Sequence, residues 1–346
     1  MSFIYNRIEN LEAFAALAEE WNALLQHSVS RVPFLRHEYL FAWWRTLGGG
    51  EWQDGLLSIY TARDAQGALR GIAPLFETTL RTGERVRMFL GSIEISDYLD
   101  WIARPEDLPE FLEGLLAHWD ANGDQGSSAL PLDLYNLLED SPSLAALAAA
   151  AETRGWHYTQ STLQPAPYIP LPGDWEAYLN RIDKKQRHEI RRKIRRLESN
   201  EAVVSRWYIV NEESALDVEI DAFLALMAQD SAKQSFLTDA MRTQMHAAVH
   251  AAFRSGWLQL AFLEINGEKA AGYLNFDFDN QVWVYNSGLN FELGAYSPGW
   301  VLLGYLLQWA NENGRTAFDF MRGDEQYKYR FGAENRFVVR VQVIPE

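Results

Sequence analysis

The sequence predicts a mixed α/β protein built from two halves, each with a sheet of mixed strand direction flanked by helices. Three strand-like runs joined by turn residues occur in each half, helical patterns surround both groups, and a cluster of prolines separates the halves. The chain has 346 residues, 48% of them hydrophobic, with 13 Trp, 15 Tyr and 18 Phe. This length and composition favour about two domains with large cores.

The first half opens with helical patterns over residues 9–27 and 37–47, the second of which ends at three consecutive glycines. Strand-like runs follow at 56–62, 69–78 and 85–90, separated by Asp-Ala-Gln-Gly and Thr-Gly turns. A helix over 105–119, a strand over 132–135, a helix over 142–153 and a strand over 156–159 complete this half.

A proline cluster marks the predicted boundary. Pro165, Pro167, Pro170 and Pro172 fall within eight residues. Proline lacks an amide donor and disfavours the helix interior, so this spacing is typical of a linker. We therefore expect an N-terminal domain over 1–164, a linker over 165–173 and a C-terminal domain over 174–346.

The second half repeats the order of the first. A helix over 175–180 leads into a basic helix that extends to residue 196, followed by a strand over 202–210 and helices over 214–229 and 238–255. Strand-like runs at 258–265, 269–277 and 282–289 are joined by Asn-Gly and Asp-Asn hairpin signals. A helix over 298–313, a strand over 316–320, a helix over 325–331 and a strand over 337–344 close the chain. The shared order predicts structural repetition without sequence repetition.

Composition excludes several classes of function. The net charge of −16 argues against broad binding of nucleic acid or of an anionic membrane, since both need a basic face. No apolar run approaches the roughly 20 residues that span a bilayer, and no secretory signal opens the chain, so we expect no membrane span. The absence of cysteine excludes thiol catalysis and thiolate metal sites and favours a cytoplasmic protein. No cluster of histidine and carboxylate shows metal-ligand spacing, so we expect no metal.

One segment reverses the charge of the chain. Residues 181–196 contain nine Lys or Arg and two acidic residues, a net charge of +7. A solvated helix face would explain part of this run. We interpret it as a candidate site for an anion, either a phosphorylated donor or an acidic carrier protein, with Arg191 and Arg195 as candidate contacts.

The region near the C-terminus contains the residues most suited to chemistry. Ser297-Pro298-Gly299 opens a helix, where Ser297 is a good N-cap, and the free amides of the first turn suit a phosphate; a capped helix with nothing bound explains the same residues. Tyr327 and Lys328, in the short helix further on, suit an acid and a neutraliser of developing negative charge, although a core tyrosine and a solvated lysine fit the pattern equally.

The order of elements in each half resembles the GNAT acyltransferase fold. The pairing of two such halves resembles the FemAB-like branch and, within it, the CelD-type proteins of polysaccharide gene clusters. The motifs that carry the resemblance are Tyr-Asn-Ser-Gly at 285–288, Ser-Pro-Gly at 297–299, Phe-Asp-Phe-Met-Arg-Gly-Asp-Glu-Gln-Tyr-Lys at 318–328 and Arg-Phe-Gly at 330–332, with weaker matches at 33–34 and 96–100. The loop at 293–299 has fewer glycines than that of typical acetyl-CoA enzymes, which weakens the case for acetyl-CoA specifically.

The resemblance implies roles for particular residues. It implies that the strand over 282–289 binds an acyl thioester, that Tyr327 protonates the leaving thiolate and that Lys328 either stabilises the oxyanion or holds the donor phosphate. Asp97 is the preferred general base, with Asp100 and Asp319 as alternatives. The implied donor contacts are Tyr285, Ser287, Ser297, Gly299, Arg191 and Arg195, and the implied acceptor contacts are Tyr98, Asp100, Asp319 and Arg322.

The resulting hypothesis is an N-acyltransferase. It moves an acyl group from acyl-CoA, or from the acyl-phosphopantetheine of an acyl carrier protein, to the amine of an amino sugar, amino acid or peptide by direct attack. Direct attack needs no covalent enzyme and agrees with the lack of cysteine and of a serine elbow. Two alternatives stay open: a FemAB-like transferase that uses aminoacyl-tRNA, with the basic helix holding the RNA, and an inactive GNAT-fold binding protein of a polysaccharide cluster.

Overall fold

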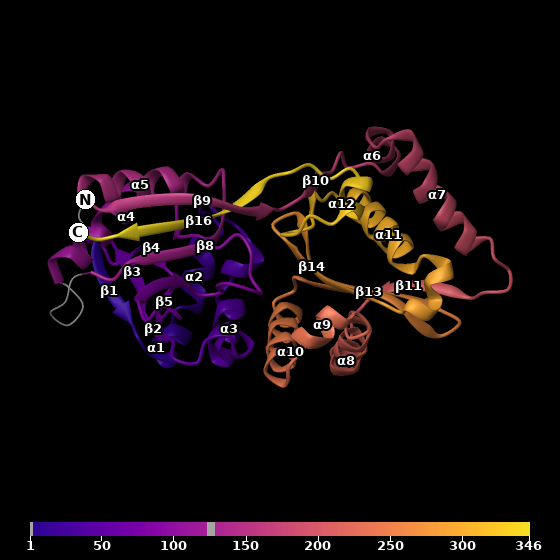
Figure 1. The fold of residues 1–346 in the computed structure, drawn as a ribbon, viewed down its shortest axis with the longest axis horizontal. Coiled ribbons are helices and arrows are strands. Elements are labelled where there is room, and N and C mark those ends of the chain that lie inside the picture. Colours follow the sequence, from indigo (N-terminus) through magenta and orange to yellow (C-terminus); the bar gives the residue numbers. More distant parts are fainter. Residues whose placement is uncertain (1–2, 123–128) are drawn as a thin grey trace. The chain divides into compact units, whose positions relative to one another are not determined.

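The computed structural model describes residues 3–122 and 129–346 and divides into two compact units. Unit 1 comprises Met1–Gln164 and Phe337–Glu346, and unit 2 comprises Pro165–Arg336. Each unit combines helices with mixed sheets, so the predicted α/β class is confirmed (Figure 1). No helix in the described part of the chain combines the length and the apolar character needed to cross a membrane.

Unit 1 contains short helices and two sheets. Its helices are α1 (Leu11–Ala16), α2 (Ala18–Leu25), η1 (Pro33–Leu35), α3 (His37–Gly50), α4 (Leu108–Asn122) and α5 (Pro142–Thr153). Its strands are β1 (Ile4–Ile8), β2 (Leu56–Leu57), β3 (Ile59–Arg63), β4 (Leu69–Ala73), β5 (Leu75–Thr79), β6 (Arg85–Phe89), β7 (Ile102–Ala103), β8 (Leu132–Leu138), β9 (His157–Pro165) and β16 (Phe337–Ile344).

The predicted strand runs of unit 1 are divided between its two sheets. One sheet has the order β1-β3-β4-β7 and the other β2-β5-β6-β8-β16-β9. Ser58 separates β2 from β3, and Pro74 separates β4 from β5, because proline cannot donate to a ladder. The amide of Ser58 still donates to the carbonyl of Leu75 at 3.1 Å, so the two sheets meet at this bend.

The last strand of the chain differs from the predicted domain division. We expected residues 337–344 in the C-terminal domain, but β16 pairs antiparallel with β8, through partners such as Val338 with Leu138 and Val343 with Leu132. Figure 1 shows β16 between β8 and β9. Its buried residues Val338, Val339, Val341 and Val343 complete the core of unit 1, and hairpin and helix periodicity cannot reveal such a long-range pairing.

Unit 2 contains one six-stranded sheet with the order β10-β15-β14-β13-β12-β11. Its strands are β10 (Tyr168–Pro170), β11 (Ser205–Ile209), β12 (Leu258–Ile265), β13 (Glu268–Phe278), β14 (Gln281–Leu289) and β15 (Ala317–Asp319). Its helices are α6 (Trp175–Arg181), α7 (Lys184–Glu198), η2 (Glu213–Ala215), α8 (Leu216–Met227), α9 (Ser231–Phe236), α10 (Asp239–Arg254), η3 (Phe291–Tyr296), α11 (Pro298–Glu312) and α12 (Gln326–Arg330).

The proline-rich segment that we expected as a linker contributes to the sheet. Residues of β10 pair antiparallel with β15, and Ile169, opposite Phe318, is buried. Proline is tolerated here because β10 is the edge strand of the sheet, whose outer side forms a bridge to Glu334 at Tyr168. The segment therefore begins unit 2 instead of lying outside it.

Helices cover both faces of the sheet in unit 2 (Figure 1). On one face α11 packs with α6 and α7 in a core that includes Ile190, Leu302 and Leu306. On the other face lie α8, α9 and α10. Neighbouring residues of β14 show the alternation: a Cβ at Gly288 would lie 2.7 Å from the Met227 amide nitrogen of α8, whereas the Leu289 side chain lies against Gly299 at the start of α11.

Candidate functional site

Strands β14 and β15 separate after a short parallel pairing. They pair only over Gln281–Trp283 and Ala317–Asp319, whereas β14 continues to Leu289. The pairing of β14 with β13 shifts by one residue at Tyr285, because Leu274 faces Asn286 and Asn275 faces Val284. Such a bulge bends the strand and often occurs beside active sites. The second half of β14 therefore has one edge without a neighbouring strand.

Side chains bind the backbone of Ser287 at this free edge. The Ser287 amide donates to the Asn286 Oδ1 at 2.9 Å, and the Ser287 carbonyl accepts from the Lys233 Nζ at 2.5 Å. Lys233 extends from α9, and its burial lowers the pKa of its ammonium, while the charges of Asp230 and Glu325 oppose that shift. Sequence reasoning missed Lys233, because nothing local shows that a one-turn helix packs beside this strand.

The start of α11 faces the same region. Ser297 takes a left-handed backbone with φ 53° and ψ 50°, and its side chain makes no capping hydrogen bond, so its predicted role as a side-chain N-cap is wrong. Among the described residues, no backbone carbonyl accepts from the Gly299 amide. A Cβ at Gly299 would lie 2.6 Å from the Leu289 Cδ2. A side chain at position 299 would therefore have to displace the Leu289 side chain where α11 approaches β14.

A pocket of about 320 Å³ lies between the free part of β14, η3 and the first turn of α11. Its volume is within the range of small-molecule sites. Most of its wall is apolar, and it is lined by Tyr273, Ser287, Leu289, Asn290, Phe291, Gly294, Ser297, Pro298, Gly299, Trp300, Leu303, Tyr327 and Phe331. The structure therefore brings together three of the predicted donor contacts, Ser287, Ser297 and Gly299, with the predicted acid Tyr327.

Two tyrosine side chains in this pocket are suited to donate a proton. Burial, followed by the charge of Glu325, raises the pKa of Tyr327, and burial, followed by the nearby Tyr327, raises the pKa of Tyr273. Both phenols are therefore protonated at neutral pH. Within residues 3–122 and 129–346 neither hydroxyl has a protein hydrogen-bond partner, so both are available to a ligand. Tyr273 was not predicted, because aromatic residues are common in strands and its local sequence gives no further signal.

Lys328 lies beside Tyr327 but does not line this pocket. Its Nζ donates to the carbonyls of Arg322 at 2.9 Å and Gly323 at 3.1 Å, and lies 2.8 Å from a carboxylate oxygen of Glu325. The side chain is only 3% exposed. In this arrangement the ammonium stabilises the loop after β15, and its hydrogen-bonding capacity is used there.

The side chains of Asp319 and Arg322 also lie outside the pocket, within the surrounding protein. Asp319 is fully buried, accepts from the Met321 amide at 2.7 Å and forms an ion pair with Arg336. Arg322 is half-buried in the loop held by Lys328, and neither side chain lines the pocket. Tyr285, at the bulge, packs on Phe276 with ring centroids 5.2 Å apart and is likewise outside the lining.

The predicted residues of the first half lie in the interior of unit 1. Asp97, Tyr98 and Asp100 are 4%, 1% and 2% exposed. Asp100 accepts from the Ser141 hydroxyl at 2.6 Å and from the Trp101 amide at 2.8 Å, which connects two elements of this unit. We expected polar residues that face a cleft; the structure instead buries all three side chains in this unit, with the Asp100 carboxylate bound to neighbouring donors.

The basic helix α7 approaches the pocket through an aromatic contact. The Lys193 Nζ lies 4.3 Å from the centroid of Trp300, which lines the pocket. Arg191 is paired with Glu176 of α6, and Arg195 is exposed without an ion pair among the described residues. Of the two arginines predicted to bind an anion, Arg195 is therefore the one whose charge is directed to solvent.

The described residues contain one group suited to a metal, which the sequence analysis missed. Asp217, His246 and His250 place one ligand atom each within 4.8 Å of one another. Two histidines four residues apart lie on one helix face, so His246 and His250 do show metal-ligand spacing. None of the three lines the pocket.

Comparison with known proteins agrees with the architecture. Residues 184–329 match the family model described as acetyltransferase (GNAT) domain, which covers α7 to α12 of unit 2. The acyltransferase class predicted from the sequence is confirmed by this match. No curated protein gives a sequence match to the chain.

Solved structures with the same fold cover nearly the whole chain. The structure titled FemX is 10% identical with a TM-score of 0.64 and covers 94% of this chain and 95% of its own. A conserved protein of unknown function from Bacteroides thetaiotaomicron is 12% identical with a TM-score of 0.63 and 99% coverage of both chains. The C-terminal domain of a putative lysylphosphatidylglycerol synthetase from Agrobacterium fabrum is 11% identical with a TM-score of 0.54 and covers 96% of this chain and 92% of its own. At these identities the likeness concerns the fold.

Proposed function

We propose that the chain is an N-acyltransferase that moves an acyl group from a phosphopantetheine thioester to an amine by direct attack. The observation that carries the proposal is the pocket beside β14, which combines a strand whose second half has one edge unpaired among the described strands, a helix start with a free amide at Gly299 and two protonated tyrosines. The acyl-CoA donor and the CelD-type branch, expected from the sequence, belong to this proposal, as does a cytoplasmic location.

The donor binds with its thioester along β14. The Gly299 amide and the start of α11 provide a positive end for a phosphate. Arg195 of α7 adds positive charge for the remaining phosphates of CoA or for an acidic carrier protein. The apolar wall formed by Leu289, Phe291 and Leu303 surrounds the acyl chain and the pantetheine arm.

Bond formation and proton transfer follow from this placement. The amine nitrogen attacks the thioester carbonyl, the carbon–sulfur bond breaks, and Tyr327 donates its proton to the departing thiolate. The proton that the acylated nitrogen must lose passes to the Tyr327 phenolate, so the amide is neutral and the acid is restored. Tyr273 donates a hydrogen bond to the oxyanion. Lys328 keeps α12 and the loop after β15 in place and so positions Tyr327. In this proposal it does not contact the reacting atoms, because its Nζ is bonded to the carbonyls of that loop.

The acceptor is an amine that is substantially neutral near pH 7. No carboxylate lines the pocket in the described part of the chain, and Asp97 and Asp100 lie in the interior of unit 1. The α-amino group, with a pKa of about 7.7–8.0, offers far more neutral nitrogen than a lysine side chain with a pKa of about 10.4. This reason favours the N-terminal amine of a peptide, and the proposal keeps amino acids and amino sugars as the other acceptor classes.

The experiment is an acyl-transfer assay that follows released thiol. The chain contains no cysteine, so a thiol reagent reports product CoA without background from the protein. A panel of acyl-CoAs of increasing length is combined with amino acids and amino sugars, with wild type and Tyr327→Phe in parallel. Thiol release that requires the acceptor and falls in the variant supports the proposal, and the absence of release with every thioester contradicts it.

A second donor is favoured by two observations. The FemX structure gives a TM-score of 0.64 over nearly the full chain, and α7 concentrates positive charge beside Trp300. These fit an aminoacyl-tRNA donor, whose ester would bind in the same pocket and be attacked there by the acceptor amine. Titration of labelled tRNA at two salt concentrations tests this donor: binding that weakens steeply with salt and with Arg195→Ala supports it. A lack of both RNA and thioester binding would leave the inactive binding protein.

A further inference from the structure

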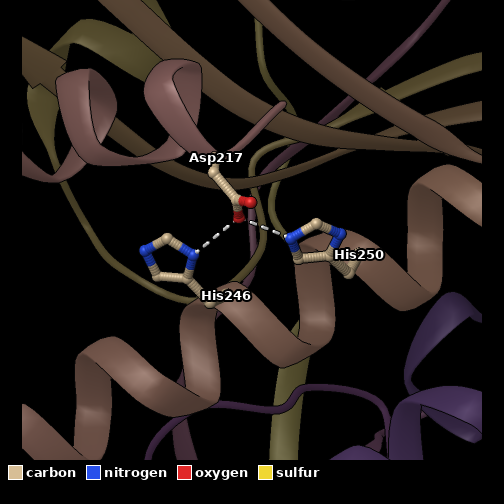
Figure 2. Close-up of side chains that lie close together, drawn as sticks. All are labelled: Asp217, His246 and His250. Atoms are coloured by element: carbon tan, nitrogen blue, oxygen red, sulfur yellow. Dashed lines mark hydrogen bonds and ion pairs between the residues drawn. The ribbon is translucent and has the colours of Figure 1, made fainter. Parts of the chain in front are cut away.

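Two neighbouring helices of unit 2 place four metal-ligating side chains together. Asp217 and Asp221 lie one turn apart on α8, and His246 and His250 lie one turn apart on α10. Residues four apart share a helix face, so each pair faces the other helix. Figure 2 shows both imidazoles directed toward the carboxylate of Asp217. The proposed acyl transfer uses none of these residues.

The distances suit a small cation. The His250 Nε2 lies 2.7 Å and the His246 Nδ1 lies 3.5 Å from the same oxygen, the Asp217 Oδ1. Ligand atoms around a tetrahedral zinc ion are about 3.4 Å apart, given bonds of about 2.0–2.1 Å. The His246 separation already has this value, and a small rotation of the exposed Asp217 side chain brings His250 to it.

Asp221 holds one of the two imidazoles in the required orientation. Its Oδ1 lies 3.0 Å from the His246 Nε2, so the other nitrogen, Nδ1, is directed at Asp217. Metal-ligating histidines usually give their second nitrogen to a carboxylate in this way. A simple surface ion pair would need only one histidine and one aspartate.

We propose that Asp217, His246 and His250 bind a divalent transition-metal ion of the zinc type, with Asp221 positioning His246. Two imidazole nitrogens and one carboxylate oxygen favour zinc over magnesium or calcium, which prefer oxygen ligands. Asp217 is 72% exposed, so water completes the coordination. The ion joins α8 to α10, and α8 supports β14 at Gly288 beside the pocket.

The test is a zinc titration of the full chain without a polyhistidine tag, after treatment with a chelator. Isothermal titration calorimetry should show one ion per chain, and Co²⁺ in its place should give the visible absorption of a tetrahedral site. Asp221→Asn should weaken binding by roughly 10–100-fold, as is typical for partners of ligating histidines. His246→Ala and His250→Ala should each weaken it more than that.

Matched controls separate this site from incidental binding. His188→Ala removes a histidine of α7 outside the cluster and should bind zinc as wild type does. Circular dichroism shows whether each variant folds, and the Co²⁺ spectrum of wild type needs no variant. The proposal is overturned if wild type binds no stoichiometric ion, or if His246→Ala and wild type bind it equally.

Discussion

Lys328 and Tyr327 are adjacent, yet the structure predicts that substitution of Lys328 lowers stability, whereas substitution of Tyr327 lowers kcat. Lys328→Met removes an ammonium that donates to the carbonyls of Arg322 and Gly323 and pairs with Glu325, in a side chain 3% exposed. Methionine fills a similar volume without a donor, so the carbonyls lose their partner. The variant should test whether this lysine supports the fold or the reaction.

The magnitude follows from burial and the number of partners. A buried carbonyl left without a donor costs about 1–3 kcal/mol, so the loss of the partner of two such carbonyls costs about 2–6 kcal/mol. Glu325 is 58% exposed and recovers water, so the two carbonyls dominate the cost. In a unit of this size each kcal/mol corresponds to about 2–4 °C, which gives a fall in Tm of about 10 °C for Lys328→Met.

Differential scanning calorimetry measures the fall, and the thiol-release assay gives kcat at a temperature where both proteins are folded. Tyr327→Phe is the matched control because its hydroxyl has no protein partner in the described residues. A Lys328→Met protein with an unchanged Tm and a large loss of kcat would refute the reasoning and restore this lysine as a group that contacts the reacting atoms.

Three further predictions concern other parts of the chain. Tyr327→Phe should lower kcat by about 10²–10⁴-fold and change the free energy of unfolding by less than about 0.5 kcal/mol; an unchanged kcat in the thiol assay would exclude it as the acid. Gly288→Ala should cost about 1–3 kcal/mol in urea unfolding, because the new Cβ meets the Met227 amide nitrogen at 2.7 Å; wild-type stability would show that α8 can move freely. Burial raises the pKa of Asp100 to about 6, above its unfolded value, so its stabilising effect is present below about pH 4 and is lost as pH rises through 6. Asp100→Asn should therefore gain up to about 3 kcal/mol relative to wild type between pH 4.5 and 7.5, and equal pH dependence of the two proteins in urea unfolding would contradict this assignment.

Local patterns predicted the elements of unit 2 well, because its strands are long and alternate clearly. The strand at 258–265 and the helix starting at Pro298 agree with β12 and α11 within a residue or so. Long-range pairing was not accessible in the same way: nothing in the alternation of 337–344 indicates β8 as the partner instead of a strand of unit 2. Prolines at 165–172 suggested a linker. Edge strands tolerate proline as well, so this composition does not distinguish a linker from an edge strand.

The candidate site was predictable where backbone chemistry marks it and not where packing creates it. Ser297 and Gly299 indicate a helix start, and the resemblance gave Tyr327 as a candidate acid. Tyr273 and Lys233 carry no such mark, because a strand tyrosine and a helix lysine are common and only the fold directs them to β14. Asp97 was chosen from a loop motif, and such a motif does not indicate that the side chain is buried in unit 1.

The charge of Glu325 connects the parts of this site. Burial is the main cause of the raised pKa of Tyr327 and of the lowered pKa of Lys233; the Glu325 carboxylate adds to the first shift, opposes the second together with Asp230, and pairs with Lys328. One carboxylate thus acts electrostatically on the tyrosine proposed to donate a proton and on the lysine that binds the Ser287 carbonyl. No carboxylate lines the described pocket to remove a proton. In the proposed reaction the pocket therefore protonates the leaving group and stabilises the oxyanion, and the acceptor amine arrives neutral.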